Sequence, residues 1–307
     1  MPGYGRPMTN DQLGFIGLGL MGSAMSRRLI GDGFGLRGYD IDRDRLDEFE
    51  ENGGRAAGSP AEAVEGCGAA VLSLPDSDVV RTVCLGENGL IDSPTRPLTV
   101  YDTTTGPPDD AVGLASALAA AGITYCDATV SGNSEIAQRG ELVVMVGGPL
   151  HAYEAGVSMF ESIGRSHHHV GRAGAGCRMK LLVNHILTIH RMALAEGLVV
   201  AELAGLDLGA TLEVLKDSLA YSKAMDAWGE RMIAGDHADP FARLRQSHKD
   251  ARLIVDHGSH LGAPVDLVTV VRDTLAEGED TGLGDLDNSS VIEVLRRRVG
   301  VGRVISP

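Results

Sequence analysis

The sequence has few aromatic residues and few cysteines. Of its 307 residues 4% are aromatic, only one is tryptophan, and four are cysteines (Cys67, Cys84, Cys126, Cys177). These cysteines form no CxxC pair and show neither zinc-ligand spacing nor the framework of a disulfide-rich secreted domain. The consecutive histidines 167–169 cannot all face one ion on an extended segment. We therefore expect a protein of the reducing cytoplasm that binds no metal.

The sequence also lacks an excess of basic residues and a long apolar run. Asp and Glu number 42 against 27 Lys and Arg, and the net charge is −15. Such a charge repels the phosphates of nucleic acids and the anionic surface of membranes. No apolar run could span a bilayer without polar interruption, and residues 1–12 lack the apolar centre of a secretory signal. We expect a soluble protein whose partner is a small molecule, and neither nucleic acid nor a membrane.

Short apolar runs alternate with helical patterns between Leu13 and Val170. The runs are "LGFIGLG", "LRGYD", "AAVLSLP", "LTVYDTT", "ITYCDATVS" and "LVVMVGG". This alternation is typical of a parallel sheet with crossover helices. After Gly171 only helical patterns follow, with breaks expected at Gly205, Gly235, Gly262 and Gly278. We predict a Rossmann-type α/β domain over residues 11–172 and an all-helical substrate and dimerisation domain over residues 173–307.

A glycine-rich turn follows the first predicted strand. The segment "GLGLMG" has the G-x-G-x-x-G pattern and precedes a helical run. In this context the first glycine permits a tight turn, the second lets a pyrophosphate approach the backbone, and the third lets helix and strand pack closely. The helix N-terminus then holds the phosphates. The predicted cofactor-binding residues here are Gly17, Leu18, Gly19, Leu20, Met21 and Gly22.

The second predicted strand ends at Asp40. A carboxylate at this place accepts hydrogen bonds from the ribose hydroxyls of NAD and repels the 2′-phosphate of NADP. We therefore predict that NAD is preferred over NADP. In the alternative interpretation Asp40 only caps the next helix, and Arg43 and Arg45 attract a phosphate.

Four ordered segments resemble signatures of the beta-hydroxyacid dehydrogenases, the 3-hydroxyisobutyrate dehydrogenase group. They are "GFIGLGLMGSAM", "DATVSGNSEIAQRGELVVMVGG", "GAGCRMKLLVN" and "KDARL". The resemblance covers nearly the whole chain. It implies a dehydrogenase that transfers a hydride between a nicotinamide cofactor and a short beta-hydroxy acid or its semialdehyde, and that forms a homodimer or homotetramer. The substrate stays open among 3-hydroxyisobutyrate, glycerate with tartronate semialdehyde, threonate, 4-hydroxybutyrate, and sulfonate or phosphonate analogues.

The resemblance also implies roles for single residues. Lys180 matches the family's catalytic lysine, and Asn184 the asparagine one helical turn later. Ser131 and Gly132 match the pair that holds the substrate carboxylate. The remaining matches are Thr105, Leu74 and Pro75 beside the nicotinamide, and Lys249, which closes over the site.

The chain departs from the family pattern D-A-P-V-S-G-G at two positions. Thr129 replaces the proline, and Asn133 replaces the last glycine. Asn133 places a side chain beside the substrate, where it either donates a hydrogen bond to a more polar substrate or only tolerates the turn conformation of glycine.

Lys180 and Asn184 lie on one face of a long apolar helix pattern, which we expect to be the buried face. A lysine can exchange the hydroxyl proton during hydride transfer when desolvation and nearby positive charge lower its pKa. We interpret the pair as lining a cleft between the domains. A lysine that reaches solvent and an asparagine that bonds a carbonyl give the structural alternative.

Two other functions fit the same scaffold. An imine reductase usually carries Asp or Tyr in place of Lys180, and a non-catalytic dinucleotide-binding module would have lost that lysine or the Ser131–Gly132 pair. Both features are present. The sequence therefore favours a dehydrogenase.

Overall fold

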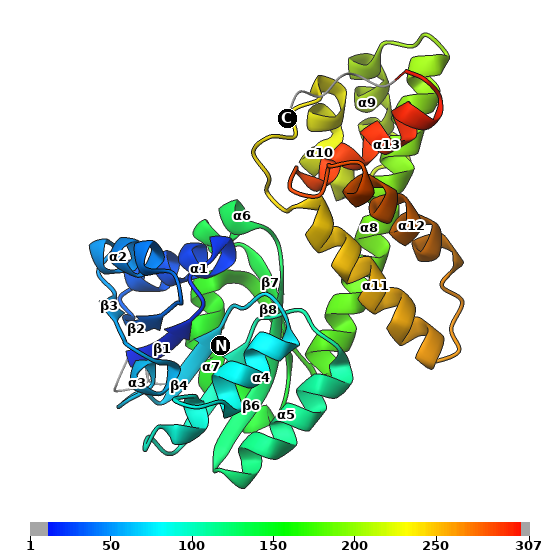
Figure 1. Cartoon of the computed structure of the whole chain (residues 1–307). Helices are drawn as coiled ribbons and strands as arrows, with labels where there is room; N and C mark the ends of the chain where they lie inside the picture. The colour runs from blue at the N-terminus through cyan, green and yellow to red at the C-terminus, as the bar shows by residue number, and fades with distance from the viewer. Residues whose placement is uncertain (1–11, 302–307) are drawn as a thin grey trace, which may run out of the picture. The chain divides into compact units, whose positions relative to one another are not determined.

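The computed structural model describes residues 12–301, and one sheet of eight strands organises its first part (Figure 1). The strands are β1 (Gln12–Ile16), β2 (Gly35–Tyr39), β3 (Arg55–Ala56), β4 (Ala69–Leu72), β5 (Leu98–Asp102), β6 (Ile123–Ser131), β7 (Leu142–Gly147) and β8 (Gly164–Gly171). Their order is β3-β2-β1-β4-β5-β6-β7-β8. The strand order thus reverses between β1 and β4, the kind of place where open α/β sheets bind ligands. All six predicted strands are present.

The sheet is not parallel throughout, and the prediction of a parallel sheet is wrong at one edge. β7 pairs antiparallel with β6, and β8 pairs parallel with β7. Residues 132–141 join β6 to β7 and contain only the short helix α6 (Ser134–Gln138). A parallel return needs a crossover of a dozen or more residues, so this connection reverses the strand direction.

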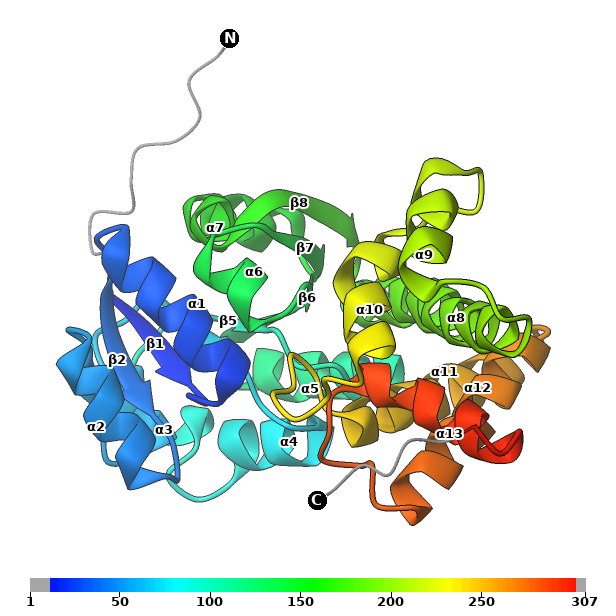
Figure 2. The same cartoon turned by 90° about the horizontal axis from the view of Figure 1, so that it is seen from above.

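Helices cover both faces of the sheet (Figure 2). One layer contains α1 (Leu20–Gly31), α2 (Arg43–Glu51), α6 and α7 (Leu150–Ile163). The other contains α3 (Pro60–Ala63), α4 (Ser77–Leu85), the 3-10 turn η1 (Leu90–Asp92) and α5 (Pro108–Ala120). Strand side chains alternate between the two layers: in β4, Val71 packs in the first, and Ala70 and Leu72 pack in the second. The strands are therefore apolar on both faces.

Short polar side chains begin several of these helices. The Ser59 hydroxyl accepts a hydrogen bond from the Glu62 N–H at 3.1 Å, with Pro60 as the first helical residue of α3. Asp76 caps α4 in the same way through the Val79 N–H at 2.9 Å. Such caps satisfy N–H groups that have no partner within the helix.

The second part is all helical, as predicted. Its helices are α8 (Ala175–Leu203), α9 (Leu208–Asp217), α10 (Lys223–Ala234), α11 (Leu244–His260), α12 (Asp266–Asp280), η2 (Asn288–Ser290) and α13 (Val291–Arg298). Gly205, Gly235 and Gly262 have positive φ between helices. The break expected at Gly278 is wrong, because α12 continues to Asp280. A Cβ at Gly278 would lie 3.1 Å from Leu244 Cδ1, so this glycine serves close packing.

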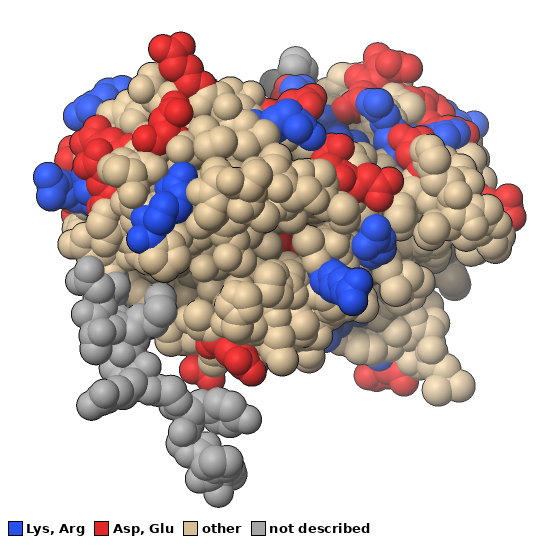
Figure 3. Space-filling model, turned by 90° about the horizontal axis from the view of Figure 1, so that it is seen from below, with Lys and Arg blue, Asp and Glu red and all other residues tan. Residues whose placement is uncertain are grey.

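The chain divides into two compact units, one up to Lys180 and one from Leu181, and α8 continues across the division. The domain boundary at residues 172 and 173 stays a prediction. None of the described helices is both long and apolar enough to cross a membrane. On the face shown in Figure 3, acidic and basic side chains are interspersed among uncharged ones. The described residues on that face form no continuous basic surface.

Candidate active site

The predicted site residues of the first unit share one edge of the sheet. They follow the carboxyl ends of neighbouring parallel strands: the glycine-rich turn after β1, Asp40 after β2, Leu74 and Pro75 after β4, Thr105 after β5, and Ser131, Gly132 and Asn133 at the end of β6. Ligands of open α/β sheets bind at this edge, where the strand order reverses.

The glycine-rich turn has the shape that a pyrophosphate requires. Gly17 has φ +93°, and a Cβ there would lie 2.2 Å from the Ser73 carbonyl oxygen. A Cβ at Gly22 would lie 1.9 Å from the Gly17 carbonyl oxygen, so α1 packs directly on the turn. At Gly19, the N-cap of α1, a Cβ would meet nothing nearer than Arg45 Nη1 at 3.9 Å. The turn is closed by its neighbours at Gly17 and Gly22 and open at Gly19, which fits a dinucleotide at the α1 N-terminus.

The remaining side chains of this segment differ in exposure. Leu18 is buried in the core, Met21 packs against that core, and the Leu20 side chain is exposed. Leu18 therefore anchors the turn, and Leu20 lies on its outer side.

Asp40 is buried and holds the turn rather than projecting freely into solvent. Its Oδ2 accepts a hydrogen bond from the Leu18 N–H at 2.7 Å, and its Oδ1 accepts one from the Asp42 N–H at 2.9 Å. Arg45 Nη1 lies 3.5 Å from Oδ2. The alternative that Asp40 caps the next helix is wrong, because Asp42 is the N-cap of α2. Each carboxylate oxygen can accept a second hydrogen bond, so Asp40 can still contact a ribose.

The segments after β4 and β5 are joined to each other. The Thr104 hydroxyl accepts a hydrogen bond from the Leu74 N–H at 3.2 Å, and the Thr103 N–H donates to the Leu72 carbonyl at 2.9 Å. Leu74 Cδ2 would lie 2.9 Å from a Cβ at Gly17. Leu74 therefore forms one border of the glycine-rich turn, and Thr104 holds it from behind.

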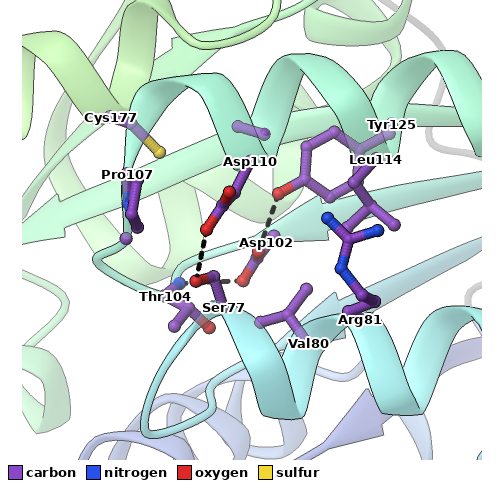
Figure 4. Close-up of a pocket in the computed structure, with 12 residues that line it drawn as sticks. Ser77, Val80, Arg81, Asp102, Thr104, Pro107, Asp110, Leu114, Tyr125 and Cys177 are labelled. Carbon is purple, nitrogen blue, oxygen red and sulfur yellow. Dashed lines mark hydrogen bonds between the residues drawn. The ribbon is translucent and has the colours of Figure 1, made fainter.

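Behind this border lies a small cavity of about 20 Å³, large enough for one water molecule (Figure 4). Asp102 reaches it from β5, Tyr125 from β6, Ser77 from α4 and Asp110 from α5. The Tyr125 hydroxyl donates to Asp102 at 2.7 Å, and the Ser77 hydroxyl donates to Asp110 at 2.7 Å. Burial raises the pKa of Asp102 to about 6, although hydrogen bonds from Thr104 and Tyr125 oppose this shift.

β6 ends in the predicted carboxylate-binding pair. Gly132 has φ +144°, and a Cβ there would lie 2.6 Å from Leu142 Cδ2, so only glycine fits after Ser131. Asn133 has φ −114° and caps α6, with Oδ1 accepting a hydrogen bond from the Ile136 N–H at 2.9 Å. The idea that Asn133 tolerates a glycine-like turn conformation is wrong, because its backbone is extended. Its side chain instead starts α6.

The same strand holds the beginning of α8. Asp127, which is fully buried, accepts hydrogen bonds from the Gly174 N–H and the Cys177 N–H, each at 2.8 Å. The Thr129 hydroxyl donates to the Gly176 carbonyl at 2.9 Å. In an α-helix that carbonyl pairs with the N–H four residues later, at Lys180. β6 therefore carries Ser131 at its end and fixes the first turn of the helix that carries Lys180.

In the second unit, Asn184 of α8 contacts α11. Its Nδ2 donates to Asp250 Oδ2 at 2.9 Å, and Asp250 Oδ1 lies 3.7 Å from Lys249 Nζ. Lys180 and Asn184 are both partly exposed, so the face that they share is not fully buried, contrary to expectation. Partial exposure is what a ligand-binding face requires.

The consecutive histidines lie on β8, at the edge of the sheet. His167 pairs with the Tyr153 hydroxyl and His169 with the Gly148 carbonyl, each at 2.8 Å. Within residues 12–301, no group of His, Cys, Asp and Glu side chains is arranged to hold a metal ion.

Three carboxylates that organise these segments were not predicted. Asp102, Asp127 and Asp250 each lie within a motif that the sequence does display, at "YDTTTGPP", "DATVSGN" and "KDARL". The available signal was an aspartate at the end of an apolar strand, or one beside Lys249, a lysine predicted to line the site. Their partners are backbone N–H groups or side chains distant in sequence, which no local pattern reveals.

Two family models match the chain. Residues 12–171 match the NAD binding domain of 6-phosphogluconate dehydrogenase, and residues 174–295 match the model described as NAD-binding of NADP-dependent 3-hydroxyisobutyrate dehydrogenase. The chain belongs to the beta-hydroxyacid dehydrogenase family. It is an NAD(P)-dependent oxidoreductase that acts on a small molecule, as the sequence predicted.

Relatives of this family match over nearly their whole length. A 2-(hydroxymethyl)glutarate dehydrogenase from Eubacterium barkeri is 31% identical, with 94% of this chain and 96% of the relative covered. Glyoxylate/succinic semialdehyde reductase 1 from Arabidopsis thaliana is 27% identical, with 93% and 98% covered. The crystal structure of a 3-hydroxyisobutyrate dehydrogenase from Salmonella typhimurium has a TM-score of 0.84 at 25% identity, with 92% and 99% covered. An imine reductase from Pseudomonas, at 20% identity and a TM-score of 0.61, shares the fold alone.

Proposed function

We propose that this chain transfers a hydride between NAD and a short beta-hydroxy acid or its semialdehyde. One observation carries the proposal. β6 ends at Ser131, just before Gly132, and the same strand holds the first turn of α8, the helix that contains Lys180. The carboxylate-binding pair and the proton-transferring lysine are thereby tied to one strand, at the sheet edge that carries the glycine-rich turn. Fixed placement of this kind is what hydride transfer demands.

The roles follow from the functional groups. When bound, the nicotinamide supplies or accepts the hydride. Ser131 and the backbone at Gly132 bind the substrate carboxylate, and Lys180 gives or takes the hydroxyl proton as general acid and base. Asn184 donates the second hydrogen of its Nδ2 group to the oxygen of the same hydroxyl, because the first is used by Asp250. Lys249 adds a positive charge that favours an anionic substrate and cofactor.

We assign the preference for NAD to two carboxylates at the end of β2. Asp40 holds the turn from the protein side, and the partly exposed Asp42 adds a second negative charge. Arg45 lies between them, 3.5 Å from Asp40 and 3.3 Å from Asp42, and offsets one of the two charges. The remaining negative charge repels a 2′-phosphate.

Asn133 supports a substrate with a polar group beyond its carboxylate. Its Oδ1 is used by the α6 cap, which orients the carboxamide and gives Nδ2 a fixed direction. One named relative acts on a substrate of this kind, 2-(hydroxymethyl)glutarate, which carries a second carboxylate. We therefore favour a substrate that carries a second oxygen-bearing group over 3-hydroxyisobutyrate itself.

The chain further acts, in our proposal, as a cytoplasmic homodimer or homotetramer. Residues 11–172 bind the dinucleotide, and residues 173–307 provide the substrate and dimerisation domain. The four cysteines are unpaired, as in a reducing compartment. Exposed apolar side chains of the helical unit support self-association, among them Val200, Leu203, Leu206 and Val214.

The test is lysine-dependent turnover. Purified protein is mixed with NAD or NADP and a panel of short hydroxy acids and semialdehydes, and the reduced nicotinamide is followed by absorbance. We expect Lys180→Ala to lower turnover about a hundred- to ten-thousand-fold while NAD affinity, measured by calorimetry, stays close to that of the wild type. Lys216→Ala, which removes a lysine paired with Glu213 in α9, is the matched control.

Two outcomes would contradict the proposal. Wild-type turnover in Lys180→Ala would remove the assigned role of the lysine. Turnover of cyclic imines, with none of any hydroxy acid or semialdehyde, would favour the imine reductase alternative.

A further inference from the structure

A buried carboxylate lies behind the segment that borders the glycine-rich turn. Asp102 ends β5 and is 4% exposed. Its Oδ1 accepts a hydrogen bond from the Thr104 N–H at 2.9 Å, and its Oδ2 accepts one from the Tyr125 hydroxyl at 2.7 Å. The Thr104 hydroxyl in turn accepts the Leu74 N–H at 3.2 Å. One hydrogen-bonded chain thus runs from β6 through β5 to the segment after β4. Figure 4 shows its part from Tyr125 through Asp102 to Thr104.

The far end of this chain touches the cofactor site. Leu74 follows Ser73, whose carbonyl oxygen would lie 2.2 Å from a Cβ at Gly17, and the Leu74 side chain packs at the same place. A displacement of Leu74 therefore changes the wall of the glycine-rich turn. Asp102 does not itself reach this wall, so its effect passes through Thr104 and Leu74.

We propose that Asp102 is a positioning residue for cofactor binding, whose negative charge holds Leu74 and Thr104 as one wall of the site and whose neutralisation weakens cofactor affinity. The inference rests on the cofactor site of the proposed function, and not on its substrate. Hydrogen bonds to an ionised acceptor are roughly twice as strong as those between neutral groups. Adding a proton to the carboxyl therefore loosens both segments without removing any atom.

The surroundings of Asp102 raise its pKa, so that the carboxyl takes up a proton in mildly acidic solution. Burial raises its pKa to about 6, hydrogen bonds from Thr104 and Tyr125 oppose this, and the charge of Asp127 adds to it. The carboxylate therefore prevails above about pH 6, and the neutral acid prevails below. We expect the wall to be firm at neutral pH and looser in mild acid.

Other titratable and charged groups pack against the same place. They are Tyr125 and Asp127 from β6, Arg81 and Cys84 from α4, Asp110 from α5, and Cys177 from α8. Burial raises the pKa of Tyr125, Cys84 and Cys177 well above their usual range, so these groups stay neutral across mild acid. Burial also raises the pKa of Asp127, and the experiment must separate this carboxyl from Asp102.

The experiment measures the affinity for NAD and for NADP by calorimetry between pH 5.5 and pH 7.5. For the wild type we expect affinity to fall about three- to tenfold on acidification, the equivalent of weakening one or two hydrogen bonds. Asp102→Asn, which has the shape of the protonated acid, should bind about three- to tenfold more weakly at pH 7.5 and change little with pH. Ser77→Ala, which alters the same cavity without touching the chain, should behave as the wild type.

A second pair of variants keeps the proposal testable if Asp102→Asn fails to fold. Thr104→Val removes the acceptor for the Leu74 N–H and should weaken cofactor affinity, and Thr104→Ser should restore it. Equal affinities in these two variants would overturn the proposal. A full pH dependence in folded Asp102→Asn would also overturn it and assign the effect to Asp127. Absence of Lys180-dependent turnover would instead count against the proposed reaction, because these titrations contain no substrate.

Discussion

We propose that single side chains after β2 set the preference for NAD over NADP. Asp40 is committed to the Leu18 and Asp42 N–H groups, so replacing it would change the turn together with the charge. Asp42 is the cleaner position, because asparagine keeps its N-cap bond to the Asp44 N–H. We expect Asp42→Asn to improve NADP affinity about two- to fivefold, within the range of exposed charge pairs. NAD affinity should change little, since NAD has no 2′-phosphate.

Calorimetric titration with each cofactor, at one fixed ionic strength, measures this change. Asp44→Asn removes an equal charge from the same first turn of α2 and is the matched control. A gain of NADP affinity of the same size in Asp44→Asn would show a general effect of net charge. No gain in Asp42→Asn would remove the assignment of cofactor preference to this strand end.

At the residue scale, the sequence predicted positions whose chemistry is local. The glycine-rich turn could be predicted because its spacing encodes its own geometry. Asp102 and Asp127 could not, because their partners lie on other strands or at the start of α8. The orientation of Asn184 likewise depends on Asp250, 66 residues away. A hydrogen bond between distant segments leaves no periodic signal in the chain.

At the scale of elements, the junction between β6 and α8 sets the position of Lys180. Asp127 supplies two acceptors to the N–H groups at the start of α8, and Thr129 adds a donor to Gly176. We expect Thr129→Val to lower the free energy of unfolding by about 1 kcal/mol and to lower kcat, because the first turn of α8 becomes less firmly held. The cofactor KM should stay unchanged, since the glycine-rich turn is not involved.

Urea unfolding and steady-state kinetics check this prediction. Thr129→Ser keeps the hydroxyl and should restore both stability and kcat. If Thr129→Val has the kcat of the wild type, the bond to Gly176 has no part in placing Lys180. An equal loss in Thr129→Ser would show that the Thr129 methyl group contributes as well, because serine lacks only that group.

Helices and strands could be predicted where the apolar pattern of the sequence reflects how the element is buried. The six strands are continuous apolar runs because helices cover both faces, and this periodicity is visible in the chain. The direction of β7 was not visible, because it depends on the short connection through α6. The helix break predicted at Gly278 was wrong for a similar reason. In the sequence, a glycine that ends a helix cannot be distinguished from one that lets a side chain such as Leu244 pack closely against the helix.

At the scale of the whole molecule, the two units bury charge differently. The first unit buries the carboxyl of Asp102, which hydrogen bonds hold, whereas the second buries an ion network around Arg296. Arg296 is fully buried, and it donates to Glu293 at 2.7 Å, to Glu202 at 2.8 Å and to the Met232 carbonyl at 3.1 Å. Burial alone would raise the pKa of Glu293, but His237 and Arg296 beside it outweigh burial and lower the pKa.

The lowered pKa of Glu293 determines how the stability of the second unit changes in acid. Because the pKa of Glu293 is lowered on folding, its contribution to stability is fully present above the ordinary glutamate value of about 4.3. That contribution is lost as the pH falls through the lowered pKa. Asp102 acts in the opposite sense: its raised pKa means that stability increases as the pH falls from above 6 towards 4.

Replacing Arg296 should therefore damage the second unit most at neutral pH. Arg296→Met leaves Glu293 buried with His237 as its remaining partner, and we expect the free energy of unfolding to fall by about 3 to 5 kcal/mol at pH 7. Loss of the Arg296 charge raises the pKa of Glu293 relative to the wild type, so the deficit should shrink at pH 5, where protonation begins to remove the buried charge. Urea unfolding of both proteins at the two pH values measures the deficit. Arg297, on the same helix, has an exposed side chain, so Arg297→Met should change the free energy of unfolding little at either pH. An equal deficit of Arg296→Met at pH 7 and pH 5 would show that lost packing, and not the buried carboxylate, accounts for the destabilisation.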